Sequence, residues 1–134
     1  MYIPPSRGFR AALIMTATVS FLAVAACSKD STDVTGTPAC TSGVSVAAGS
    51  GTTPKFTWTP NCSVAGLFVQ RVSDGVNMWT VSTTDTPLKS GISYGDETIP
   101  GTTSAALTLT AGTQYRVGLV NATGVELATR LFTP

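Results

Sequence analysis

Between residues 40 and 134, apolar side chains recur at every second position, and this alternation is the strongest constraint on the fold. A spacing of two is typical of a β-strand, because successive side chains point to opposite faces of a sheet. Clusters of Gly, Pro, Ser, Asp and Asn interrupt the runs. The expected strands are 43–48, 55–59, 65–72, 77–82, 91–94, 105–110, 114–121 and 125–132. So many short strands predict one antiparallel all-β domain, a sandwich or a small barrel.

The first two runs predict a hairpin that turns at "AGSGTT", near Gly51. Folding there gives three facing pairs, which are Val46 with Phe56, Val44 with Trp58 and Cys40 with Cys62. All six positions are even, so alternation places them on one face. Facing β-carbons lie close to the spacing that a disulfide needs. We therefore expect a Cys40–Cys62 disulfide, the alternative being two free buried thiols.

A second hairpin is expected around "VSDGVN", where Asp74-Gly75 is a tight-turn signal. A two-residue turn would set Val69 against Thr80. A three-residue connection sets Val69 against Trp79, and Leu67 against Val81, which matches apolar to apolar. The second register is preferred for that reason.

The stretch "LTLTAGTQYRVGLVNATG" places Leu109 six residues before Tyr115, with Gly112 and Thr113 between them. Together with Trp58 in "KFTWTP", it resembles the fibronectin type III and wider immunoglobulin-like sandwiches. The resemblance implies an immunoglobulin-like antiparallel β-sandwich in which Trp58, Leu109 and Tyr115 form part of the core. It also implies that the Tyr115 hydroxyl hydrogen-bonds to the backbone of the turn that leads into the expected strand 114–121. Ala111 stands where the family pattern has proline.

Residues 1–26 read as an export signal, with Arg7 and Arg10 ahead of the uncharged run 11–26. The run ends in "VAAC" (24–27), which resembles the lipobox of bacterial lipoproteins. That resemblance implies cleavage before Cys27 and acylation of Cys27, whose several acyl chains hold a protein durably on a membrane. Two alternatives stay open: an ordinary signal with an incidental Cys27, and an uncleaved membrane helix.

The polar segment 27–39 follows, and its composition predicts a flexible tether between Cys27 and a β-sandwich domain at 40–134. Ser28 stands after the cysteine, where the sorting rule of diderm lipoproteins puts aspartate in proteins that are kept at the inner membrane. The resemblance thus implies an outer-membrane location, facing the periplasm or the cell surface.

Composition argues against several functions. The chain has no histidine, which removes the commonest general base and metal ligand, and its formal net charge is only +1. "GISYG" (91–95) matches the nucleophile elbow of α/β-hydrolases, but no helix follows and no histidine could activate Ser93. Asp96 and Glu97 are adjacent and point apart in a strand or turn. We expect no enzyme, no metal, no cofactor beyond the lipid on Cys27, and no nucleic-acid partner.

Three apolar or aromatic residues are candidate exposed contacts for a partner: Met78, Trp79 and Tyr94. Alternation would turn either Met78 or Trp79 outward, although Trp79 in the core is the simpler interpretation. The sequence thus favours a lipid-anchored, non-catalytic envelope module that binds an unknown protein or carbohydrate partner or serves as a scaffold. The alternative is an accessory subunit of a membrane complex, held by an uncleaved N-terminal transmembrane helix.

Overall fold

The computed structural model describes residues 36–134, and these form an all-β fold, as expected. The strands are β1 Ser45–Ala48, β2 Lys55–Thr59, β3 Gly66–Arg71, β4 Asn77–Ser82, β5 Ile92–Ser93, β6 Thr102–Thr103, β7 Tyr115–Val120 and β8 Glu126–Phe132. The expected signal segment, Cys27 and most of the expected tether lie outside the described residues.

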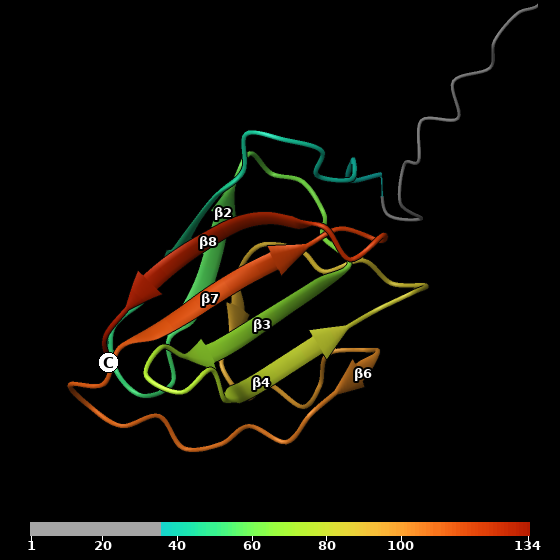
Figure 1. The fold of residues 1–134 in the computed structure, drawn as a ribbon. Helices are drawn as coiled ribbons and strands as arrows, with labels where there is room; N and C mark the ends of the chain where they lie inside the picture. Colours follow the sequence, from blue (N-terminus) through green and yellow to red (C-terminus); the bar gives the residue numbers. More distant parts are fainter. Residues whose placement is uncertain (1–35) are drawn as a thin grey trace, which may run out of the picture.

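Two antiparallel sheets make up the fold (Figure 1). One has three strands in the order β1-β2-β5, and the other has five in the order β6-β4-β3-β7-β8. The chain passes from the first sheet to the second after β2, returns for β5, and then completes the second sheet. This sandwich-like arrangement leaves β4, β3 and β7 as the inner strands of the larger sheet, each paired on both sides.

A single core lies between the two sheets. The three-stranded sheet contributes Val46, Phe56, Trp58 and Ile92, and the five-stranded sheet contributes Leu67, Val69, Trp79, Val81, Tyr115, Val117 and Leu119. Within β7 the core residues are those at every second position, which is the alternation that the sequence predicted. Phe132 of β8 packs edge-on against Phe56 and so joins the two sheets, with ring centroids 5.6 Å apart.

The expected register of the first hairpin is wrong by two residues. Val46 faces Trp58, and Ala48 faces Phe56. The connection is centred one residue later than expected, because the Gly49 amide donates to the Lys55 carbonyl at 2.9 Å and closes a longer loop. A shift of two preserves parity, so Val46, Phe56 and Trp58 still face the core.

The second hairpin has the preferred register. Val69 faces Trp79, and Leu67 faces Val81. Beyond Val69 the ladder shifts, since Gln70 faces Asn77 and leaves Met78 as the extra residue of a β-bulge.

The strand expected at 105–110 does not form, and β6 lies just before it. Segment 104–107 instead runs irregularly along β4, with Ser104 and Leu107 amides donating to the Thr80 and Met78 carbonyls at 2.9 Å each. The Leu107 carbonyl accepts a hydrogen bond from the Tyr94 hydroxyl at 2.7 Å. The Tyr94 hydroxyl thus donates to a backbone carbonyl that a regular β-ladder would have paired with a backbone amide.

Candidate functional site

A disulfide joins Cys40, which precedes the first strand, to Cys62, which follows β2. This is the pairing that the sequence predicted. The two Cα atoms lie 5.0 Å apart, and both cysteines are buried. The bond does not extend the β1–β2 ladder, which ends at Thr59 because Pro60 has no amide hydrogen to donate. Residues 38–40 instead run parallel to 62–63: Ser63 donates to Pro38 at 2.9 Å and accepts from Cys40 at 2.8 Å.

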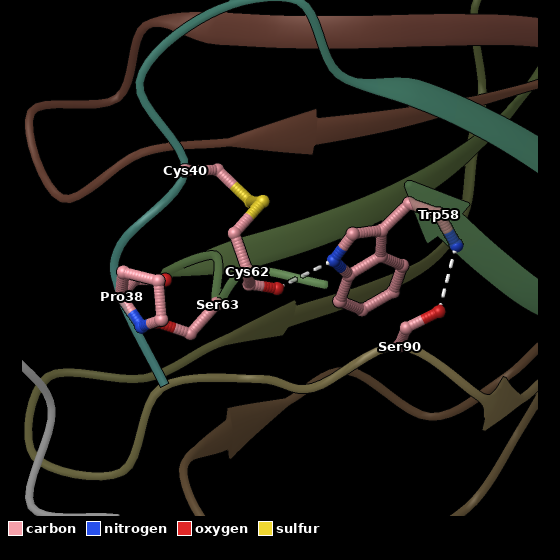
Figure 2. Close-up of a disulfide and its surroundings, with 6 residues drawn as sticks. All are labelled: Pro38, Cys40, Trp58, Cys62, Ser63 and Ser90. Atoms are coloured by element: carbon pink, nitrogen blue, oxygen red, sulfur yellow. Dashed lines mark hydrogen bonds between the residues drawn. A yellow bond between two sulfur atoms is a disulfide. The ribbon is translucent and has the colours of Figure 1, made fainter. Parts of the chain in front are cut away.

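Trp58 lies beside this disulfide, and Figure 2 shows its indole pointing at the Cys62 carbonyl. The indole Nε1–H donates to that carbonyl at 2.8 Å, and the backbone amide of Trp58 donates to the Ser90 hydroxyl at 2.8 Å. The side chain is 3% exposed. Its burial needs a partner for the indole N–H, and the chain that leaves β2 supplies one.

The corner before β7 has the contacts expected of Leu109 and Tyr115. Both side chains are buried. The Tyr115 hydroxyl oxygen accepts a hydrogen bond from the Thr110 amide at 2.9 Å. Tyr115 thus supplies both a buried apolar ring and a hydrogen bond to the backbone, and together they fix the turn that leads into β7.

Met78, Trp79 and Tyr94 are not exposed contacts, so that candidate role is wrong for all three, whereas the simpler interpretation of Trp79 as a core residue is confirmed. They are 3%, 1% and 7% exposed. The bulge at Met78 interrupts alternation, so both it and Trp79 are buried. The Tyr94 ring packs edge-on against Trp79 with centroids 5.3 Å apart. Its hydroxyl donates to the Leu107 carbonyl, and burial raises the pKa of Tyr94 to about 12.

The "GISYG" stretch forms the two-residue strand β5 followed by a turn. Ser93 is exposed and faces Lys55 across the ladder. The two neighbours of Ser93 are buried, Ile92 against the core and Tyr94 as described above. The stretch therefore lacks the strand–turn–helix setting of a hydrolase elbow.

Two of the acidic side chains stabilise turns. Asp74 forms an ion pair with Arg71 at 2.8 Å, and Arg71 and the Val76 amide together hold the pKa of Asp74 below its ordinary value. The Thr98 hydroxyl and amide lower the pKa of Asp96 in the same way. Within residues 36–134 no group of three His, Cys, Asp or Glu side chains is placed to hold a metal ion.

The outer face of the five-stranded sheet carries a polar–aromatic cluster that sequence reasoning missed. Phe68 directly faces Gly118, and its ring occupies the space where a β-carbon of residue 118 would lie. The Arg116 guanidinium lies over the same ring, 5.0 Å from its centroid. Gln70 accepts from Arg116 at 3.2 Å, and Glu126 lies 3.5 Å from it. Only the β3–β7 register reveals this cluster, since its members are far apart in sequence.

A shallow hollow borders this cluster at the edge strand β8. Arg116, Thr129, Arg130 and Leu131 line it, and its volume is about 310 Å³. Leu131 is 52% exposed there. A concave area that combines a held guanidinium, a hydroxyl and an aliphatic side chain is suited to contact with a partner.

Comparison of the chain with protein-family models, with curated proteins and with solved structures finds no match. Residues 36–134 contain no helix of the length and apolarity that crossing a membrane requires.

Proposed function

We propose that this protein is a bacterial envelope lipoprotein that displays a non-catalytic binding or scaffolding module on a membrane anchored through Cys27. The observation that carries the proposal is the Cys40–Cys62 bond. With those two cysteines joined, the third cysteine of the chain is the one in the lipobox-like "VAAC". A disulfide also accords with an exported protein, because such bonds persist in oxidising compartments.

The module is proposed to be an immunoglobulin-like sandwich of the fibronectin type III kind. Three features support this assignment. They are the two antiparallel sheets, the buried Trp58 on β2, and the Tyr115 hydroxyl tied to the backbone at Thr110. Such domains commonly serve as spacers or binding modules, although fold alone does not define a ligand.

The binding surface is proposed to be the outer face of the five-stranded sheet around Arg116. The guanidinium is held from below by Phe68 and from the side by Gln70, so little side-chain entropy remains to be lost on binding. A protein or a carbohydrate partner fits this chemistry. A catalytic role is not proposed, since the chain has no histidine and the stretch around Ser93 lacks the strand–turn–helix setting of a nucleophile elbow.

The location is proposed to be the outer membrane, on the periplasmic or the surface side. Ser28 follows the anchor cysteine, and the polar segment after it would let the module stand away from the bilayer.

Metabolic labelling with a fatty acid, followed by mass spectrometry of the membrane-extracted chain, tests the anchor. We expect a mature N-terminus at an acylated Cys27. The Cys27→Ser variant should lose both label and membrane association, while Ser28→Ala, the matched control, keeps both. An intact residue 1 on the membrane-bound protein would refute the proposal and favour the accessory subunit with a retained transmembrane helix.

The binding role is tested with the mature chain on glycan arrays and by crosslinking in the envelope. Arg116→Ala should lower binding at least several-fold relative to wild type. Arg71→Ala, which removes a guanidinium paired with Asp74 in the β3–β4 turn, should leave binding unchanged. Equal binding by both variants would show that the sheet face is not the contact surface.

A further inference from the structure

The chain enters the described fold at residues 38–40, before any strand begins. At this point three links join it to the segment that follows β2. Cys40 is bonded to Cys62, and the Pro38 carbonyl and Cys40 amide both pair with Ser63. Figure 2 shows the disulfide with Pro38 and Ser63 beside it.

The segment on the other side of these links is itself firmly held. The Cys62 carbonyl accepts from the buried Trp58 indole of β2 at 2.8 Å. Two residues later, Val64 exchanges backbone hydrogen bonds with Leu88 at 3.0 and 2.8 Å. Cys62 therefore lies where the chain crosses between the two sheets, close to the core on both sides.

The next element along the chain, β1, is held much less firmly. Its four residues form one ladder, with β2, and Val46 is its only fully buried side chain. Residues 41–43 ahead of it are exposed. The inner strands β3 and β7, by contrast, are six residues long and are paired on both sides.

We propose that the disulfide transmits mechanical tension from the anchor to the sandwich. Tension that arrives from Cys27 passes through the Cys40–Cys62 bond directly to the start of the five-stranded sheet. The segment 41–61, which includes β1 and β2, then lies outside the path of the tension. Without the bond, the same tension would fall on the two backbone hydrogen bonds to Ser63 and then on the short β1 ladder, and these would detach before the inner strands. This inference rests on the proposed anchoring at Cys27.

Single-molecule pulling of the unlipidated full chain tests it. One handle is attached to the Cys27 thiol and the other after Pro134. The oxidised chain should unfold with no earlier step, and reduction of the unfolded molecule should then add roughly 70 Å. That length is the extended span of the 22-residue separation less the 5.0 Å that the bond already covers.

The double variant Cys40→Ala, Cys62→Ala should show a separate first step at lower force. Detachment of β1 frees the chain as far as the start of β2, which adds at most about 60 Å. Wild-type protein that is folded oxidised and then reduced on the instrument should show the same step. This second sample keeps the test valid if the double variant folds poorly.

As a control, the N-terminal handle is attached at a different residue of the double variant. With Cys27→Ala and Ser50→Cys, the handle lies after β1, so the first step at the length expected for β1 should vanish. The proposal is overturned if the reduced and double-variant chains unfold at the same force as the oxidised chain, with no earlier step. Because the protein is unlipidated, this result is independent of the fatty-acid labelling that tests the anchor itself.

Discussion

Replacing Gly118 with alanine should destabilise the protein, and the sign of the effect should depend on Phe68. A β-carbon on residue 118 would overlap the Cζ and Cε1 atoms of the Phe68 ring and lie 3.0 Å from Cε2. The backbone at Gly118 is not in the left-handed region, so alanine is free of strain there. The three atoms nearest to the added β-carbon all belong to that ring.

The magnitudes follow from two opposing terms. Overpacking against a ring that must swing aside costs about 1–3 kcal/mol. Alanine in place of glycine in a strand returns about 0.5–1 kcal/mol, because the unfolded chain loses less freedom. With Phe68 present the net loss is about 0–2.5 kcal/mol, with a central value of about 1 kcal/mol. In a Phe68→Ala background only the second term remains, and Gly118→Ala should stabilise by about 0.5–1 kcal/mol.

Urea unfolding of the four proteins in this cycle measures both effects. For a domain of this size, each kcal/mol corresponds to about 4–8 °C in Tm, so a thermal melt provides an independent check. If Gly118→Ala has the same sign and size in both backgrounds, the contact between ring and backbone does not explain the glycine, and the reasoning fails.

Three further predictions concern the disulfide and two tyrosines. Cys40→Ala with Cys62→Ala should lower the free energy of unfolding by about 3 kcal/mol, from the loop entropy of a 22-residue separation, as measured by urea unfolding; no change in midpoint would refute this. Tyr115→Phe should cost about 1–2 kcal/mol in the same assay, because the Thr110 amide loses its acceptor; an unchanged stability would mean that water replaces the hydroxyl. Burial raises the pKa of Tyr94 to about 12, so the stability it contributes is present below about pH 10 and is lost as the pH rises towards 12. The stability difference between wild type and Tyr94→Phe should therefore shrink between about pH 10 and pH 12, and a constant difference would contradict the assigned burial.

Local patterns predicted much of the fold, and errors arose where a longer-range contact changed a local rule. The register of the first hairpin was two residues off because loop closure between Gly49 and Lys55 depends on backbone geometry that composition does not encode. Met78 was misplaced because a bulge breaks the alternation on which its placement rested. Residues 105–110 alternate like a strand, but the Tyr94 hydroxyl donates to the Leu107 carbonyl, which a regular β-ladder would have paired with a backbone amide.

The candidate binding surface shows a different limit. Arg116, Gln70 and Phe68 come from two strands that are nearly fifty residues apart, as the 46-residue separation of Arg116 and Gln70 illustrates. Nothing in their local sequence distinguishes them from other strand residues. Their meeting depends on the pairing of β3 with β7, and on a glycine that leaves room for the ring.

The sequence by itself determined the all-β class, the alternating core positions and the pairing of Cys40 with Cys62. The class and the core positions depend on parity, which a shift of two residues leaves unchanged. The facing pair from which the disulfide was predicted does not survive that shift, and the bond forms outside the ladder. The tertiary structure alone decided the register of the first hairpin, the bulge in the second and the route by which Cys40 reaches Cys62, because these depend on which backbone groups are free to pair once the sheets have packed. It also decided where the disulfide acts, which is at the entry of the chain, outside the hairpin ladder.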